Sequence, residues 1–214
     1  MPIISELYQI DSVQSLFKET FSDNKRKWEV VERESETAEI KAGNYWMKNK
    51  SISDWNYYKT KSMLKQNQDF ILESDIELVE KEDAYGHFGL VWGFDEKLEN
   101  LNRFTISADG RRALIMHFEK DHNRVFHRFH IRNTNKYHVN KKIRFSLIKL
   151  GDYFHFLINK EKIYCAHVSM FCKTGNYIGF YIEPGLSIKS DYIELKKMKT
   201  KEMLVANGIQ QLVS

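Results

Sequence analysis

Cysteine and proline are the scarcest residues in this 214-residue sequence, with two of each. Cys165 and Cys172 are too few for a disulfide framework, and we expect both to be reduced, partly buried residues. No apolar run approaches the roughly 20 residues that span a bilayer. The first residues, Met1 to Glu6, lack the basic and apolar regions of a signal peptide. We therefore expect a cytoplasmic protein that is not embedded in a membrane.

Several sequence motifs of enzymes are also missing. The chain has no Gly-x-Ser-x-Gly elbow for a nucleophilic serine and no glycine-rich loop for phosphate. Neither cysteine has a neighbouring residue that would activate its thiol. These absences exclude the nucleophile-elbow hydrolases and the P-loop nucleotide-binding proteins.

Aromatic residues, by contrast, are plentiful, with 14 Phe, 11 Tyr and 4 Trp. Short segments with alternating apolar and polar residues follow one another, separated by turn signals about 8–12 residues apart. From Asp69 to Val79 the alternation is clean, with mainly acidic residues on the polar side from Glu73 onward. No long amphipathic helix is evident. The pattern predicts an all-β protein, an antiparallel β-sandwich or jelly roll with an aromatic core.

The predicted sandwich covers residues 15–197 as one domain. Residues 1–14 are expected to form an N-terminal extension, in which Asp11 could cap a short helix. Residues 198–214 are expected to form a C-terminal extension, either a short helix through Met203, Leu204 and Val205 or a flexible end. Both extensions are candidates for docking to a partner.

The run from Gly86 to Phe94 is the strongest candidate for a central strand. Strand alternation places large apolar side chains on one side: Phe88, Leu90, Trp92 and Phe94. It places small or polar side chains on the other: His87, Gly89, Val91 and Gly93. We therefore expect a strand with the core on one side and a shallow open surface on the other.

Charge is unevenly distributed, although the net charge is only +4. Nine acidic residues and two lysines lie between Glu73 and Glu99, and nine basic residues and one aspartate between Lys120 and Lys149. One interpretation is that these segments are neighbouring strands whose charges pair across the sheet. The other is a basic surface for an anionic partner.

Four groups of motifs, in this order, carry a resemblance to a known superfamily. They are Phe21-Ser22-Asp23-Asn24 with Trp28; Ile40 to Tyr45; Asp69 to Glu73 with Gly89 to Gly93; and Phe156 to Asn159 with Gly175 to Phe180 and Asp191 to Ile193. Together they cover roughly residues 17–196. The chain resembles the concanavalin A-like lectin/glucanase sandwiches, and most closely the branch of the 3-keto-disaccharide hydrolase-like domains and their uncharacterised bacterial relatives.

The resemblance implies a module that binds or processes carbohydrate or interacts with protein. Sugar-processing members often carry an arginine at the end of the strand that corresponds to Gly89–Gly93, where this chain has Gly93. Its absence removes a bidentate polar anchor and argues against catalysis.

The expected ligand site is the open, concave face of the sheet. Its candidate ligand-binding residues are His87, Arg103, Thr105, His117, His155 and Tyr181. A flanking aromatic platform for a sugar ring would come from Trp46, Trp55, Tyr57 and Tyr58. The alternative for these aromatic residues is that they seal the edge of the sandwich.

Three other chemistries have candidate residues in the sequence. Glu73, Asp75 and Glu77 alternate along one strand, like the carboxylates of some sandwich glucanases, although an acidic solvent-facing strand is the simpler interpretation. A metal site is not expected, although His87, His117 and His155 could converge and calcium is possible at Asp23, Asn24 and Asp191. Nucleic-acid binding through Arg124, Arg128 and Arg132, with Phe126 and Phe129, is not expected.

The sequence thus favours a non-catalytic recognition or assembly module that binds a glycan or a protein partner. The alternative is a glycan-processing enzyme, similar to a glycoside hydrolase, that uses the concave face of the sandwich. The oligomeric state and the identity of the ligand are left open by the sequence.

Overall fold

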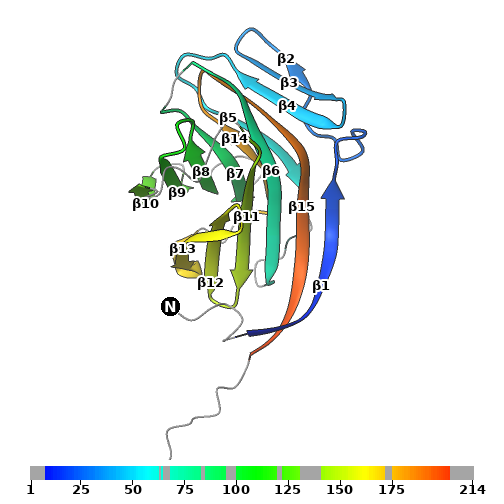
Figure 1. Cartoon of the computed structure of the whole chain (residues 1–214), viewed down its shortest axis with the longest axis vertical. Coiled ribbons are helices and arrows are strands. Elements are labelled where there is room, and N and C mark those ends of the chain that lie inside the picture. The colour runs from blue at the N-terminus through cyan, green and yellow to red at the C-terminus, as the bar shows by residue number, and fades with distance from the viewer. Residues whose placement is uncertain are drawn as a thin grey trace, which may run out of the picture.

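The computed structural model describes residues 8–62, 64, 68–82, 85–94, 100–119, 122–130, 141–171 and 175–202, and these form two antiparallel β-sheets packed face to face (Figure 1). The predicted all-β sandwich is therefore confirmed. Its one described helical segment is the three-residue 3₁₀ turn η1 (Val168–Met170). No helix among these residues is long and apolar enough to cross a membrane.

The larger sheet has nine strands in the order β13-β12-β11-β6-β15-β4-β3-β2, with β1 beside β15. They are β1 (Tyr8–Glu19), β2 (Val31–Glu32), β3 (Glu36–Lys41), β4 (Asn44–Asn49), β6 (Phe70–Lys81), β11 (Ile143–Leu150), β12 (Tyr153–Ile158), β13 (Glu161–His167) and β15 (Leu186–Glu202). Strand β15 is long enough to pair with β4 through Leu186–Ser190 and with β1 through Ile193–Glu202. Strand β6 lies on its other side, near the middle of the sheet (Figure 1).

The smaller sheet has six strands in the order β10-β9-β8-β7-β14-β5. They are β5 (Asn56–Lys61), β7 (His87–Phe94), β8 (Asn100–Ser107), β9 (Arg112–Glu119), β10 (His122–His130) and β14 (Tyr177–Ile182). The predicted strand at Gly86–Phe94 is thus β7, and it lies inside the sheet between β8 and β14.

The core between the sheets is aromatic, as expected. Trp92 on β7 lies 5.8 Å from Phe154, 5.8 Å from Phe156 and 5.7 Å from Phe171, measured between ring centroids. Phe88, Leu90 and Trp92 all point into this core and are almost completely buried. The alternation predicted for the first six residues of β7 is therefore correct.

Phe94, however, lies on the opposite side of the sheet from Trp92. The pairing of β7 with β14 shifts register at this point, and Gly93 has a φ of 65°. That left-handed conformation is easily adopted by glycine, and such a bulge reverses the side to which the next side chain points. Phe94 packs in a second buried cluster with Val91, Leu101 and Tyr181. The prediction that Phe94 faces the main core is wrong for this reason.

The same cluster changes the expected open face of β7. Gly89 and Val91 are buried, so this part of the sheet is not a shallow exposed floor. Gly89 is needed for close packing, because a Cβ atom there would overlap the backbone oxygen of Phe104 on β8.

Both ends of the predicted domain lie inside strands. Residues 8–14, expected as an extension with a short helix at Asp11, belong to β1. The helix is wrong because these residues pair with β15, and a sheet partner outweighs a weak local helix signal. Strand β15 likewise continues past residue 197 to Glu202. The helix proposed at Met203–Val205 lies outside the described residues, and the division into extensions stays a prediction.

Candidate glycan-binding face

The outer side of the nine-stranded sheet carries a ladder of opposite charges. Strand β6 buries every second side chain from Phe70 to Leu78, so Glu73, Asp75 and Glu77 point outward. Each of them meets a cation from a neighbouring strand. We call this surface the charged face and define it by its central residues: Glu73, Asp75, Glu77, Arg144, Ser146, Lys189, Tyr192 and Lys196.

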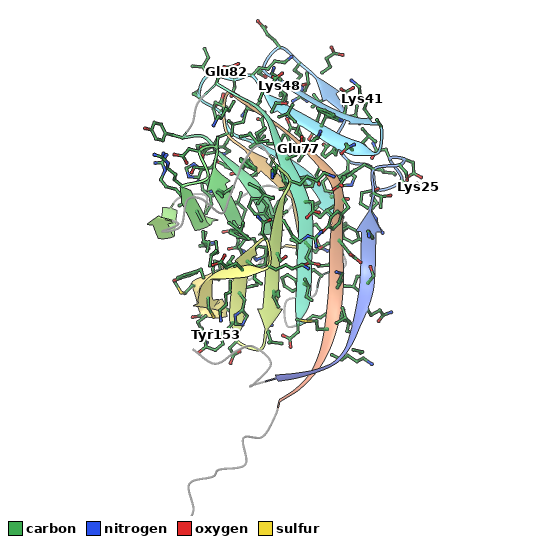
Figure 2. All side chains as sticks on the ribbon, in the orientation of Figure 1. Lys25, Lys41, Lys48, Glu77, Glu82 and Tyr153 are labelled. Atoms are coloured by element: carbon green, nitrogen blue, oxygen red, sulfur yellow. The ribbon has the colours of Figure 1, made fainter. Side chains whose placement is uncertain are left out.

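The charges of this face pair across the strands. Lys196 lies 2.8 Å from Glu73, and Lys189 lies 3.1 Å from Glu77. Further up the same face, Lys48 pairs with Glu80 at 2.6 Å, and Figure 2 shows Lys48 and Glu77 there. These three lysines lie outside the basic segment Lys120–Lys149, so the pairing expected between the acidic and basic segments is confirmed only where Arg144 meets Asp75.

Asp75 and Arg144 form the best-aligned of these pairs. Arg144 lies directly opposite Asp75 in the β11–β6 register, and its Nε and Nη2 donate to the two carboxylate oxygens at 2.7 and 2.8 Å. Two parallel hydrogen bonds fix the planes of both groups. The hydrogen bonds to Asp75 raise the pKa of Arg144 above its ordinary value.

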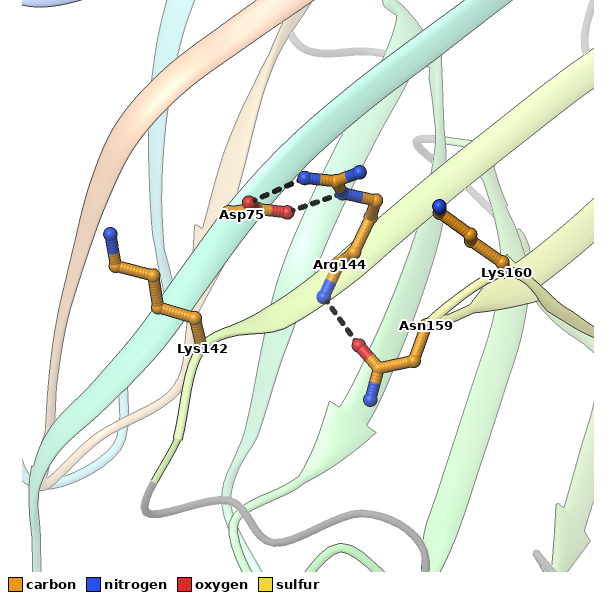
Figure 3. A pocket seen from close by; sticks show the side chains of 5 residues that line it. All are labelled: Asp75, Lys142, Arg144, Asn159 and Lys160. Atoms are coloured by element: carbon orange, nitrogen blue, oxygen red, sulfur yellow. Dashed lines mark hydrogen bonds and ion pairs between the residues drawn. The ribbon is translucent and has the colours of Figure 1, made fainter.

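A surface pocket of about 260 Å³ opens beside this pair (Figure 3). Its lining residues are Asp75, Lys142, Arg144, Asn159 and Lys160. Lys142 pairs with Asp191 at 2.6 Å, and this hydrogen bond raises the pKa of Lys142. The pocket therefore offers a carboxylate, an amide, a guanidinium and two ammonium groups to a ligand.

The turn between β12 and β13 supplies two of these groups. Asn159 and Lys160 both have positive φ, 50° and 70°, which is the conformation of a two-residue hairpin turn that Asn favours. The Asn159 backbone N–H donates to the Arg144 carbonyl at 2.8 Å, and the Arg144 backbone N–H donates to Asn159 Oδ1 at 2.9 Å. The turn is thus held against β11 beside the Asp75–Arg144 pair.

Two aromatic rings lie on the charged face. The Tyr192 hydroxyl lies 3.5 Å from Asp75 Oδ1, and its ring lies 5.9 Å from the Arg144 guanidinium carbon and 5.4 Å from Lys18 Nζ. Burial raises the pKa of Tyr192. Trp46 on β4 lies under Lys189, with Nζ 5.0 Å from its ring. A face with aromatic rings beside planar hydrogen-bonding groups suits a sugar, which has both hydroxyls and apolar C–H surfaces.

The residues predicted for the concave face are not brought together. His87, Arg103, Thr105 and Tyr181 lie on the outer side of the six-stranded sheet, but Thr105 and Tyr181 are fully buried. His117 shares the inner side of β9 with Ile115; its side chain is 3 % exposed and contacts Asn102 Oδ1 at 3.2 Å. His155 lies on β12 in the other sheet, where burial lowers its pKa. The six residues therefore occupy three separate places.

The polar groups of the six-stranded sheet bond mainly to one another. Arg103 donates to Met116 Sδ and lies 4.4 Å from the Tyr181 ring. The Tyr181 hydroxyl donates to Glu183 at 2.7 Å, and the His87 backbone N–H donates to the other Glu183 oxygen at 2.8 Å. Burial acts to raise the pKa of Glu183, but the hydrogen bonds from His87 and Tyr181 outweigh it and lower the pKa overall. These side chains are therefore held in place by contacts with one another.

The predicted aromatic platform is also divided. Tyr58 points between the sheets and is fully buried, because neighbouring residues on β5 face opposite sides. Tyr57 packs on Tyr181 at 5.3 Å, and burial raises the pKa of Tyr57 to about 12. Trp55 is 47 % exposed in the loop before β5, whereas Trp46 lies on the charged face. The alternative, aromatic residues that close the sandwich, fits Tyr58, whereas Tyr57 packs in the outer cluster of the six-stranded sheet.

The metal and nucleophile candidates do not form sites in the described part of the chain. No three His, Cys, Asp or Glu side chains there are placed to hold a metal ion. Asp23 binds Lys25, and Asn24 binds both the backbone N–H and the carbonyl of Trp28, which are turn contacts. Burial raises the pKa of Cys165, which disfavours its reactive thiolate. Cys172 and the side chains of Arg124, Phe126, Arg128, Phe129 and Arg132 lie outside the description.

Comparison with solved structures places this geometry among known folds. An endo-β-1,3-glucanase from Pyrococcus furiosus matches with a TM-score of 0.64 and 8 % identity, over 92 % of this chain and 99 % of that one. A β-glucanase from Bacillus licheniformis matches with a TM-score of 0.63 and 9 % identity, over 87 % and 98 %. The fold is that of the lectin/glucanase sandwiches. The CBM2 module of the evolved Dit protein of Lactobacillus casei BL23 phage J-1 shares it, with a TM-score of 0.60, 10 % identity and coverage of 87 % and 96 %.

At these identities the likeness is one of fold. No protein-family model and no curated protein sequence matches this chain. The sandwich fold implied by the resemblance is thus confirmed, while membership of the superfamily and the closer resemblance to the 3-keto-disaccharide hydrolase-like branch stay predictions.

Sequence reasoning missed five residues of the pocket region: Lys142, Arg144, Asn159, Lys160 and Tyr192. A signal for Asn159 and Lys160 was available, since Asn-Lys-Glu-Lys separates two strand-like segments as a hairpin turn. No short sequence pattern indicates that Tyr192 lies beside Asp75, because the two residues are far apart in the sequence.

Proposed function

We propose that this chain is a non-catalytic recognition module that binds a glycan on the charged face. The observation that carries the proposal is the pocket in which Asp75, Arg144 and Asn159 present planar hydrogen-bonding groups beside the Tyr192 ring. Neighbouring sugar hydroxyls pair well with carboxylate and guanidinium groups whose orientation is already set. The carbohydrate-binding module and the glucanases that share the fold support the ligand class by analogy.

Binding without catalysis is favoured by the state of the three carboxylates. Glycoside hydrolysis needs one carboxyl group to give a proton and a second to act as nucleophile or base. Here Arg144 holds Asp75 at both oxygens, Lys189 pairs with Glu77, and Glu73 accepts from Ser146 and Lys196. All three are therefore already engaged as acceptors by neighbouring side chains.

A glycan-processing enzyme is the second candidate, and the spacing along β6 supports it. Residues two apart on a strand are separated by roughly 6.8 Å, and inverting glycosidases place their two carboxyl groups about 6.5–9.5 Å apart. Glu73 with Asp75, or Asp75 with Glu77, would meet that requirement if a ligand displaced the cations.

A protein partner is a third possibility, supported by the loop before β5. Ile52 is 99 % exposed and Trp55 is 47 % exposed. The loop that carries them is braced from inside, because buried Asn49 donates to the Asp54 carbonyl and accepts from Ser51. An exposed apolar pair on a fixed loop is a feature of contact surfaces. The predicted cytoplasmic location is compatible with any of the three functions and stays a prediction.

A glycan-array screen, run beside an assay for released reducing ends, tests the proposal. We expect binding to at least one glycan and no release of sugar from β-1,3-glucan or β-1,3-1,4-glucan. Asp75→Asn should weaken the binding. Sugar release that is lost in Asp75→Asn would establish the enzyme. Capture of a protein in a native pull-down, with no glycan bound on the array, would replace the glycan proposal by assembly.

A further inference from the structure

We propose that the glycan bound on the charged face carries an oxyanion, a sulfate or a carboxylate, and that Lys142, Arg144 and Lys160 bind this group. The inference rests on the proposed function and specifies its ligand class. It follows from the balance of charge in the pocket, which differs from that of the rest of the face.

The pocket has an excess of positive charge. Three of its five lining residues are cations and one is an anion; with Asp191, which pairs with Lys142, the group keeps a net charge of +1. By contrast, Glu77 faces one lysine, Lys189, and Lys196 contacts both Glu73 and Glu194. The rows that flank the pocket are therefore neutral or acidic. An anionic substituent would therefore bind most favourably in the pocket. Uncharged sugar units suit the ion-paired residues on either side of it.

Lys160 carries the inference furthest. It is exposed and has no ion-pair or hydrogen-bond partner among the residues that the structure describes. A lysine on a flexible loop loses backbone and side-chain entropy when it binds a ligand. The backbone of this turn is already held by the hydrogen bonds between Asn159 and Arg144. The backbone entropy of Lys160 is thus already lost in the free protein, and only its side chain has to be ordered on binding.

Arg144 adds donors that face the same space. A guanidinium has five N–H donors, and Asp75 accepts from two of them. The others have no acceptor among the described residues. Figure 3 shows Lys142 and Lys160 on opposite sides of the Asp75–Arg144 pair, so a group placed between them would meet cations on both sides. Such charge-assisted hydrogen bonds are short, strong and sensitive to salt.

Matched pairs of glycans test the inference on the intact protein. One arm compares chondroitin sulfate with chemically desulfated chondroitin, and the other compares polygalacturonate with its neutral methyl ester. We expect the wild type to bind the more anionic member of at least one pair about tenfold more tightly. The preference should shrink as salt is raised from about 0.05 to 0.5 M. The two arms distinguish sulfate from carboxylate.

Two variants locate the effect. Lys160→Gln should remove most of the preference for the anionic member and leave the affinity for its neutral counterpart unchanged. Lys162→Gln is the control, because Lys162 is an exposed lysine on β13 that does not line the pocket. Both side chains are exposed, so both variants should melt at the temperature of the wild type.

Three outcomes would overturn the inference. If the protein bound the charged and the neutral glycan of each pair with equal affinity, the inference would be wrong and the glycan proposal would stand. If Lys160→Gln and Lys162→Gln lost the preference for the anionic glycan to the same extent, the attraction would be a general effect of surface charge and not a property of the pocket. Failure to bind any glycan on the array would overturn the proposed function itself, and the inference with it.

Discussion

Arg144 on β11 lies directly opposite Asp75 on β6, and its guanidinium donates to both oxygens of the Asp75 carboxylate. The two residues are 69 positions apart in the sequence. Their side chains join two central strands of the nine-stranded sheet and leave further N–H groups pointing toward the pocket. The pair is partly buried, with side-chain exposures of 16 % for Asp75 and 37 % for Arg144, so we expect it to contribute to the stability of the sheet as well as to binding.

Removing the Trp92 ring should destabilise the protein strongly. Trp92 is 2 % exposed and packs against three phenylalanine rings, so Trp92→Ala should lower the free energy of unfolding by about 3–5 kcal/mol. Urea titration measures this loss. Trp55→Ala is the matched control, because Trp55 is half exposed and should change stability by less than about 0.5 kcal/mol. Similar losses in the two variants would contradict the core described above.

Gly179 on β14 should not accept a side chain. A Cβ atom there would overlap the backbone oxygen of Tyr58, and backbone atoms cannot rotate away as a side chain can. Gly179→Ala should lower the free energy of unfolding by about 2–3 kcal/mol. Gly43→Ala, at a turn glycine with φ of 69° and open space around it, should lower it by only about 1 kcal/mol. The reverse order of the two losses would show that β14 and β5 are not packed this closely.

His155 should make stability depend on pH. Burial lowers its pKa below the ordinary value of 6.5, so the unfolded chain binds a proton at a pH where the folded chain does not. Stability therefore rises with pH through this window and is lost as pH falls below about 6.5. In His155→Gln this dependence should be weaker. Urea titrations of both proteins at pH 7.5 and 5.5 should show a smaller difference between the two pH values in the variant; an equal difference would refute the assignment.

The Arg103–Tyr181–Glu183 network should affect stability and leave glycan binding unchanged. Tyr181→Phe removes the hydrogen bond to Glu183 and should lower the free energy of unfolding by about 1 kcal/mol. Affinity for any glycan bound on the charged face should not change, because Tyr181 lies on the outer side of the other sheet. A clear loss of affinity without loss of stability would instead move the binding site to the six-stranded sheet.

Much of the fold followed from local patterns, because strand alternation and turn residues act over a few positions. Strand β6 and the first part of β7 have the predicted faces. Phe94 does not, because a bulge at Gly93 reverses the alternation. His117 was assigned to the outer surface of its sheet, but it shares the inner side of β9 with Ile115 and lies in the interior.

The site was harder to predict than the fold, because it depends on which strands become neighbours. The acidic strand and the basic strand were each visible in the sequence, and pairing between them was one of two interpretations. Their register, which sets Arg144 opposite Asp75 and Tyr192 beside it, arises from contacts between distant segments. No local pattern reports such contacts.

Isothermal titration of the tightest-binding array glycan into the wild type and Arg144→Gln tests the central claim most directly. Lys48→Gln is the control, since Lys48 is a cation of the same side-chain exposure, 37 %, in an ion pair on the same sheet, but does not line the pocket. We predict that Arg144→Gln weakens binding at least about tenfold, the loss expected for a bidentate charged contact, while Lys48→Gln binds like the wild type. Unchanged affinity in Arg144→Gln would contradict a glycan site on the charged face.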